Sequence, residues 1–222
     1  MDIAKIHRFY KSPLGKWVSS LVRDKVKTDD VSDVLWLGYG QEFRRPTDIW
    51  GITEANLDLS LEGHSNLLFY QSDLFPFAAN SFNKIVVLHG FEFSKDPVNF
   101  LHNIWDALEG EGEFHMIVPN RSGFWARGEK TPFGEGRPYS LNQIYKLLVQ
   151  TGFSVINAEH CLYTPPSANK LSLSIAPHYE WLGHKLNLPF GGLIYTRCKK
   201  EIFRPKMVKE TQKVFAVQTV PA

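Results

Sequence analysis

Side chains at several places in this 222-residue chain could take part in chemistry. His89 and Glu92 follow the apolar run KIVVL, and imidazole and carboxylate groups are the usual general bases of enzymes. Asp73 follows the run LLFY and offers a strong hydrogen-bond acceptor. Gly38 and Gly40, in VLWLGYGQE, let the backbone turn sharply and approach a ligand with no Cβ between them. Together these residues indicate a site for a polar ligand and for proton transfer.

Each of these residues also has a structural interpretation. A Gly-x-Gly turn after a strand is common, so alone it is weak evidence for a cofactor loop. Glu92 could equally be a solvated acid that caps the following turn, and His89 could simply line the site. His115 lies within the apolar run EFHMIV and is the weakest candidate base, because a lone histidine on a strand is more often a satisfied structural residue.

Other kinds of chemistry are disfavoured. The eight histidines show no HxxxH or HExxH spacing, so no metal site is expected. The chain lacks a GxSxG nucleophile elbow and the GxGxxG turn of nicotinamide enzymes. Cys161 and Cys198 form no CxxC pair and are expected to be partly buried thiols.

The composition indicates a globular protein without a nucleic-acid partner. Hydrophobic residues make up 43% and charged residues 22%, while the net charge of +2 is too small to imply nucleic-acid binding. No apolar run approaches the ~20 residues of a membrane span. Lys5, His7 and Arg8 interrupt any signal-peptide core, so we expect a cytoplasmic protein. A homodimer is left open.

The elements that must position these residues follow from periodicity. Helical spacing over residues 3–27 is interrupted by Ser12-Pro13, which predicts two N-terminal helices. Further helices are predicted from Asp96-Pro97 to Gly110, from Ser140 to Gly152 and over Leu171–Leu186. The predicted strands are Val34–Leu37, Ile49–Ile52, Leu67–Tyr70, Lys84–His89, Glu113–Val118, Phe153–Leu162 and Leu193–Cys198.

This alternation predicts an α/β, Rossmann-like fold. We expect a mainly parallel seven-stranded sheet with helices on both faces and an N-terminal helical extension. The expected units are a helical cap over residues 1–30, an α/β domain over 31–203 and a tail over 204–222, in which VFAVQTV could add an edge strand. Ligands of such sheets bind at the carboxyl ends of the strands, where Thr53-Glu54, Asp73-Leu74 and Asn120 are expected to join the glycine turn and His89.

The long loop over residues 120–139 lies at the same sheet edge. Glycines at positions 123, 128, 134 and 136 could act as hinges, so we interpret the loop as a lid over a substrate. Arg127 or Arg137 would meet an anionic group, with Trp125 and Tyr139 beside it. The alternative is an ordered loop whose aromatic side chains plug the sheet edge. Tyr10 could fold across the same end or simply pack between helices.

Two long segments resemble a known family. The runs SDLFPFAANSFNKIVV and LHGFEFSKDPVNFLHNIWDALEGEGEFHMIVPN resemble class I S-adenosylmethionine-dependent methyltransferases, in particular the small-molecule, type-11-like branch. The resemblance covers about residues 30 to 160. The segments FYKSPLG, FWARGEKTPFGEGRPYS and the Pro-Pro pair at Pro165 are similar to a bacterial subgroup of these proteins.

The resemblance implies S-adenosylmethionine as cofactor and a small-molecule or lipid-like methyl acceptor. It implies that Gly38-Tyr39-Gly40 pass beneath the methionine and ribose, and that Thr53 or Glu54 meets the ribose. It also implies that Asp73 and Leu74 contact the adenine. His89 and Gly90 would lie near the sulfonium and the acceptor, with His89 or Glu92 as the base.

The chain departs from the family pattern around the glycine turn. Trp36 stands where an acidic residue is usual, Glu42 replaces the third glycine, and Thr53 stands where an acid usually grips the ribose. Only nine residues separate Gly40 from Ile49, which leaves barely one helical turn before the second strand, and Pro46 limits it further. A second hypothesis therefore stands beside methyl transfer: a protein that keeps the fold without catalysis and serves as a binding or regulatory partner.

Overall fold

The computed structural model describes residues 2–28, 32–53, 67–70, 75–127, 131–166 and 170–201. Glu54, Asp73, Leu74 and the tail with VFAVQTV lie outside these ranges. Thr53 is the last residue of its strand. No helix in the described ranges is long and apolar enough to cross a membrane.

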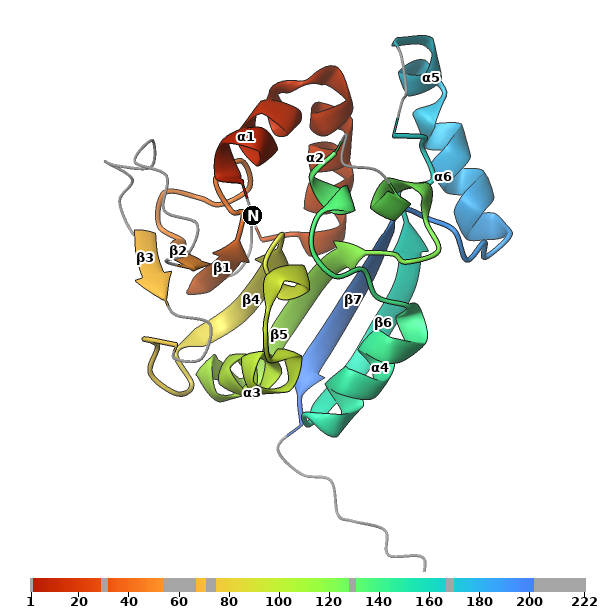
Figure 1. Cartoon of the computed structure of the whole chain (residues 1–222). Helices are drawn as coiled ribbons and strands as arrows, with labels where there is room; N and C mark the ends of the chain where they lie inside the picture. Colours follow the sequence, from red (N-terminus) through yellow and green to blue (C-terminus); the bar gives the residue numbers. More distant parts are fainter. Residues whose placement is uncertain are drawn as a thin grey trace, which may run out of the picture.

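A seven-stranded mixed sheet forms the centre of the molecule, in the order β3-β2-β1-β4-β5-β7-β6 (Figure 1). Strands β1 to β5 pair in parallel, whereas β7 is antiparallel to both β5 and β6. The prediction of an α/β, Rossmann-like architecture is therefore confirmed. The strands are β1 Val34–Gly38, β2 Ile49–Thr53, β3 Leu67–Tyr70, β4 Phe82–Leu88, β5 Leu108–Pro119, β6 Phe153–Cys161 and β7 Leu193–Lys200.

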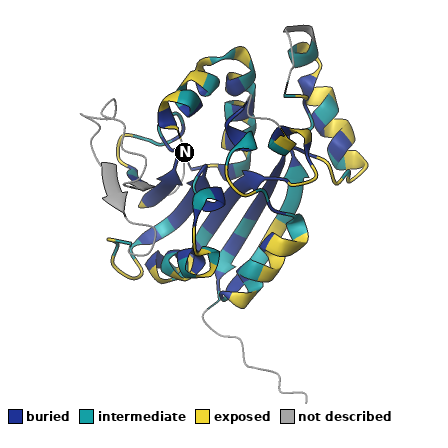
Figure 2. Cartoon of the chain, in the orientation of Figure 1, coloured by how far each residue is buried: buried dark blue, intermediate teal, exposed yellow. Residues whose placement is uncertain are grey.

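Helices cover both faces of the sheet because the buried strands are apolar on both sides (Figure 2). The helices α1 (Ile3–Lys11) and α2 (Pro13–Val26) pack against the face that carries Trp36, Val86 and Leu88. The helices α3 (Pro97–Ala107) and α4 (Leu141–Gln150) cover the opposite face. The short α5 (Lys170–Ser174) and α6 (Ala176–Lys185) lie at one end of the molecule (Figure 1).

The helix starts follow the predicted capping residues. The Ser12 side chain accepts a hydrogen bond from the Gly15 backbone N–H, and Pro13 occupies the first turn of α2. Asp96 caps α3, and Ser140 forms a capping box with Gln143 at the start of α4. The predicted break between two N-terminal helices is confirmed.

The predicted end of α3 at Gly110 is wrong. The helix ends at Ala107, and β5 begins at Leu108 because Leu108 pairs with Phe82 of β4. Glu111 has a φ of 66° within this stretch, so the turn chemistry of Gly110 to Gly112 serves an irregular strand start and not a helix stop.

The long loop is ordered over its described residues 120–127 and 131–139. It contains the short 3₁₀ turns η4 (Phe124–Arg127) and η5 (Pro132–Gly134). Its two ends are tied together, since the Arg121 N–H donates to Tyr139 O and the Tyr139 N–H donates to Pro119 O. The loop is therefore anchored at the carboxyl end of β5.

Candidate functional site

The carboxyl ends of β1 and β4 lie side by side and explain the first glycine of the turn. Gly38 pairs with Leu88 and has a φ of 88°. A Cβ on Gly38 would lie 2.2 Å from Leu88 O and 2.7 Å from His89 O. Packing between the two strand ends thus requires this glycine whether or not a ligand binds there.

His89 follows β4 directly and is fully buried. Its Nε2 lies 3.0 Å from the Tyr10 hydroxyl, and its Nδ1 lies 3.4 Å from Glu92 Oε1. The backbone φ of His89 is 52°, a value that is uncommon for residues other than glycine and that persists only where the surroundings enforce it. We call Glu92, His89 and Tyr10 the strand-end cluster.

Glu92 is buried under the long loop. It lies on the 3₁₀ turn η3 (Phe91–Phe93), and the Arg137 N–H donates to its backbone carbonyl over 2.8 Å. Gly136 has a φ of 76°, and a Cβ there would lie 2.9 Å from Glu92 Cγ. The interpretation of Glu92 as a solvated loop acid is therefore wrong. Neither carboxylate oxygen accepts a hydrogen bond from a described residue, which is rare for a buried polar group.

Tyrosine rings from α1 and from the glycine turn close over this cluster. Tyr10 and Tyr39 are both buried and stack with ring centroids 5.1 Å apart, and the Tyr39 hydroxyl lies 3.1 Å from His7 Nδ1. Burial raises the pKa of both phenols well above the usual value. Both hydroxyls are therefore neutral near pH 7 and can act as hydrogen-bond donors.

The residues that depart from the family pattern hold α1 in this position. Glu42 forms an ion pair with Lys11 at 3.0 Å, and its carboxylate lies 3.6 Å from His7 Nδ1. Phe43 packs edge-on against Tyr10 at 5.3 Å, and Trp36 stacks on Phe43 at 5.6 Å. The divergence at Trp36 and Glu42 is thus matched by a helix that covers the strand ends.

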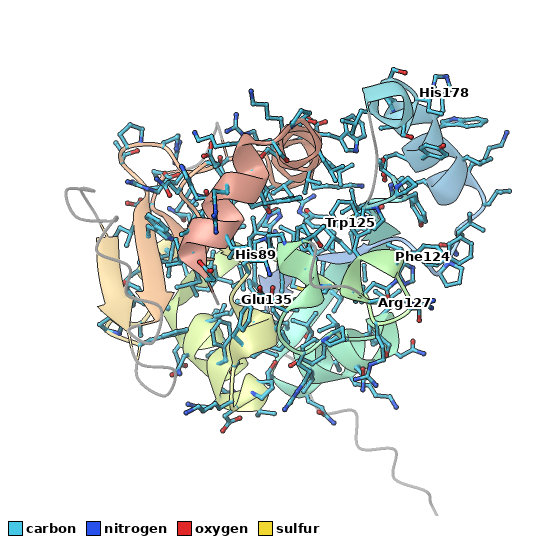
Figure 3. The ribbon with its side chains drawn as sticks, turned by 45° about the horizontal axis from the view of Figure 1, so that its top comes forward. His89, Phe124, Trp125, Arg127, Glu135 and His178 are labelled. Carbon is cyan, nitrogen blue, oxygen red and sulfur yellow. The ribbon has the colours of Figure 1, made fainter. Side chains whose placement is uncertain are left out.

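The long loop closes the same space from the other side (Figure 3). The Phe133 ring lies 4.5 Å from the His89 ring, and Phe133 and Trp125 both pack edge-on against Phe9. Glu135 forms an ion pair with Lys5 of α1. Helix α1 and the loop therefore meet above His89 and exclude solvent from it.

Other predicted residues occupy different places. The Asn120 side-chain amide donates to the carbonyls of Pro189 and Gly191, so it holds the segment that precedes β7. The Arg127 guanidinium lies over the Phe124 ring, away from His89 (Figure 3). The Tyr139 ring packs on Phe91 at 5.1 Å. The structure brings together Tyr10, Gly38, Tyr39, His89, Gly90 and Glu92.

The sequence prediction missed two contributors to the site, His7 and Phe43. His7 is three residues before Tyr10, and this helical spacing places both on one face of α1. That spacing could have identified His7. No local signal identified Phe43, because its role depends on the packing of α1.

His115 has the structural role predicted for it. Its Nδ1 lies 2.9 Å from the Tyr195 hydroxyl and its Nε2 lies 3.1 Å from Glu113 Oε2. Burial lowers the pKa of His115 to about 4. Burial alone would raise the pKa of Glu113, but hydrogen bonds from Arg197 and His115 lower it to about 2. We call Glu113, His115 and Tyr195 the mid-sheet cluster.

The side chains of the strand-end cluster are of the kinds that attract a positively charged group. A buried carboxylate whose oxygens accept no hydrogen bond from a described residue, with aromatic rings nearby, is an environment that a desolvated cation prefers. Among the described residues, no group of three or more His, Cys, Asp or Glu side chains could hold a metal ion. The two described cysteines are free thiols, as predicted, and both are fully buried rather than partly buried.

Comparison with known proteins identifies the fold. No family model and no curated protein sequence matches the chain. An S-adenosylmethionine-dependent methyltransferase from Thermotoga maritima aligns with a TM-score of 0.61 and 16% identity over 88% of this chain and 91% of its own. An S-adenosylmethionine-dependent methyltransferase from Archaeoglobus fulgidus aligns with a TM-score of 0.60 and 16% identity. The alignment covers 87% of this chain and 97% of the Archaeoglobus chain.

A third similar structure was determined with ligands. Geranyl diphosphate C-methyltransferase from Streptomyces coelicolor, in complex with Mg²⁺, geranyl diphosphate and S-adenosyl-L-homocysteine, gives a TM-score of 0.53 and 12% identity over 89% of this chain and 82% of its own. These similarities show that the chain has the fold of S-adenosylmethionine-dependent methyltransferases.

Proposed function

We propose that the chain binds S-adenosylmethionine at the carboxyl ends of β1 and β4 and transfers its methyl group to a small-molecule or lipid-like acceptor. The observation that carries this proposal is the buried Glu92 carboxylate, which lies among aromatic rings and accepts no hydrogen bond from a described residue. When bound, S-adenosylmethionine supplies a methyl group on a cationic sulfonium.

Different residues would hold the two ends of the cofactor. The Glu92 carboxylate would stabilise the positive charge of the sulfonium. The resemblance assigns the ribose to Thr53 or Glu54, the adenine to Asp73 and Leu74, and the backbone beneath the methionine to Gly38 and Gly40. Methyl transfer needs alignment and exclusion of water more than it needs a base. Helix α1 and the long loop provide both.

His89 is the proposed base for acceptors that must lose a proton. Glu92 near Nδ1 would orient the imidazole and stabilise it when protonated, which leaves Nε2 free to take the proton. The Tyr10 hydroxyl now lies against Nε2 and would relay the proton or give way to the acceptor. The loop segment Gly136-Arg137 keeps water away from Glu92. The low local dielectric strengthens the contacts that His89 makes with Glu92 and with Tyr10.

The surroundings of His89 favour an acceptor with an apolar part. Phe9, Trp125 and Phe133 form a packed aromatic cluster beside the imidazole. The similar Streptomyces enzyme is named for a prenyl diphosphate, which supports a lipid-like acceptor for this chain as well. We further propose that the protein is cytoplasmic and does not act on nucleic acid.

A second function, binding without catalysis, is favoured by the packing of α1. Tyr10 and Tyr39 stack directly on each other above the glycine turn, and Glu42 anchors α1 there through Lys11. A protein whose α1 never leaves this position would serve as a binding or regulatory partner. The fold alone does not decide between the two functions.

A thermal-shift titration with S-adenosylmethionine and with its demethylated product tests the proposal. A ligand that binds only the folded chain raises the melting temperature as its concentration rises. Both ligands are expected to do so, and Asp73→Ala is expected to abolish most of the shift, whereas Asp106→Ala on the exposed side of α3 should leave it unchanged. The absence of a shift with the wild-type chain at millimolar ligand would contradict the proposal.

Turnover separates the two functions. With methyl-labelled S-adenosylmethionine and a mixed extract of lipids and small metabolites, a catalytic chain yields labelled extract that disappears with His89→Gln. A chain that shows a thermal shift but yields no labelled product supports the binding function.

A further inference from the structure

An apolar cavity lies outside the strand-end cluster, between η4, the 162–166 segment and α6. Its volume is about 180 Å³, and its lining includes Phe124, Trp125, Pro165, Leu182, Leu188 and Phe190. None of the described residues that line it carries a charge. Neither the proposed cofactor nor the proposed base uses this cavity.

The polar groups of the residues that line the cavity make hydrogen bonds to other protein groups and not to the cavity. The Thr164 carbonyl accepts a hydrogen bond from Trp125 Nε1 over 2.8 Å, and the Thr164 hydroxyl accepts one from Trp17 Nε1 over 3.1 Å. The buried Glu180 carboxylate accepts from the Tyr163 N–H over 2.6 Å. Because these partners are all internal, the surface left to the cavity is apolar.

The cavity is also preformed. A Cβ on Gly183 would lie 2.3 Å from the Tyr163 ring, so α6 rests directly on that ring. The Tyr163 hydroxyl donates to the Leu188 carbonyl over 2.9 Å and fixes the segment that follows α6. A rigid apolar cavity of this kind binds apolar groups, and an engineered cavity of about 150 Å³ takes a benzene ring.

The rim of the cavity is apolar and positively charged. Phe124 is 60% exposed, Leu182 46% and Phe190 43%. The Arg127 guanidinium lies 5.3 Å from the Phe124 ring centroid (Figure 3), and the Lys185 ammonium lies 4.6 Å from the ring of Trp181, the neighbour of Leu182. Within the described ranges, no carboxylate lies within ion-pair distance of either cation.

We propose that this cavity binds the hydrocarbon or aryl part of a single-chain anionic amphiphile, with the anionic head at Arg127. The apolar wall favours the hydrocarbon part of the ligand, and the positively charged rim favours a negatively charged head group. Trp125 separates this site from the strand-end cluster, since its ring packs on Phe133, which in turn packs on His89. The site therefore does not depend on the proposed methyl transfer.

Titration calorimetry with three ten-carbon probes below their micelle concentrations tests the proposal: decanoate, decanol and decylammonium. Decanoate is expected to bind at one site per chain, decanol more weakly, and decylammonium weakest, by at least about tenfold relative to decanoate. Leu188→Trp, which fills the cavity, should weaken decanoate binding at least about tenfold.

Variants that change only a surface charge test the proposal without disturbing the packing around the cavity. Arg127→Gln at the surface should weaken decanoate about threefold to tenfold and leave decanol unchanged. Lys146→Gln, on the exposed side of α4, should change neither. Equal binding of decanoate and decylammonium, or unchanged binding by Leu188→Trp, would overturn the proposal. So would binding to anionic phosphatidylglycerol vesicles without binding of free decanoate, since a membrane surface would then be the partner.

Discussion

Two buried histidines of this protein each lie between a glutamate and a tyrosine. In the mid-sheet cluster, His115 contacts Tyr195 and Glu113 at hydrogen-bond distance, and Arg197 pairs with Glu113. In the strand-end cluster, His89 contacts Tyr10, but its Nδ1 and both Glu92 oxygens lack a hydrogen bond from a described residue. The two clusters have the same residue types, but they differ in how many of their polar atoms make hydrogen bonds.

The difference indicates what each cluster does. The mid-sheet cluster is a closed network that stabilises the sheet between β5 and β7. The strand-end cluster holds a carboxylate that accepts no hydrogen bond from a described residue and a residue with positive φ, two features that destabilise a fold and concentrate at functional sites. Loss of a glutamate should therefore have opposite consequences in the two clusters.

The largest effect on stability is expected for Glu113→Gln. The neutral amide loses charge-assisted interactions with Arg197 and His115 and leaves the buried Lys84 ammonium without its ion-pair partner. We expect the free energy of unfolding to fall by about 2–4 kcal/mol. Urea unfolding measures it. Glu111→Gln, on the same strand but exposed, is the control and should change the free energy by less than about 0.5 kcal/mol.

The mid-sheet cluster should also make stability depend on pH. The folded pKa of His115 is lowered to about 4, so the unfolded chain binds more protons, and stability falls as pH drops from about 6.5 towards 4. The folded pKa of Glu113 is lowered to about 2, so a further loss follows below about 4.5.

We expect this loss to amount to about 1–3 kcal/mol between pH 7 and pH 4. Urea unfolding at several pH values measures it, and His115→Leu should show a shallower slope. A wild-type chain that gains stability over this interval would show that His115 is not held neutral in the fold.

Removal of the tyrosine hydroxyls gives a smaller contrast. The Tyr195 hydroxyl contacts His115 and donates to the Lys25 carbonyl, so Tyr195→Phe should lower the unfolding free energy by about 1–2 kcal/mol. The Tyr10 hydroxyl has a single described partner, His89, and Tyr10→Phe should lower it by about 0.5–1 kcal/mol. Chemical denaturation measures both losses. Equal losses of unfolding free energy for Tyr195→Phe and Tyr10→Phe would contradict the difference between the two clusters.

The smallest effect is expected for Glu92→Gln. The amide replaces a buried carboxyl group whose oxygens accept no hydrogen bond from a described residue, so the unfolding free energy should stay the same or rise by up to about 1 kcal/mol. A loss above about 2 kcal/mol in urea unfolding would mean that Glu92 is a structural residue like Glu113.

The fold was largely predictable because its signals are local. Ser12, Asp96 and Ser140 cap helices at the expected positions, and the apolar runs form the expected strands. The end of α3 was not predictable from Gly110, since pairing of Leu108 with Phe82 decides it. Tertiary pairing overrides a turn signal there.

The candidate site was predictable only in part. His89 and Glu92 are near each other in sequence at a strand end, so their proximity followed from position. Their burial did not, because it depends on Gly136 of the distant loop and on Tyr10 of α1. The ion pair of Glu42 with Lys11 joins the glycine turn to α1, a contact that no local signal revealed.

Calorimetric titration with S-adenosylmethionine and S-adenosylhomocysteine tests most directly whether the strand-end cluster binds the sulfonium. If the buried Glu92 carboxylate meets this cation, the wild-type chain should bind S-adenosylmethionine at least about fivefold more tightly than the neutral product, and Glu92→Gln should lose that preference while remaining folded. Equal affinities in the wild-type chain, or a preference that survives in Glu92→Gln, would contradict this account.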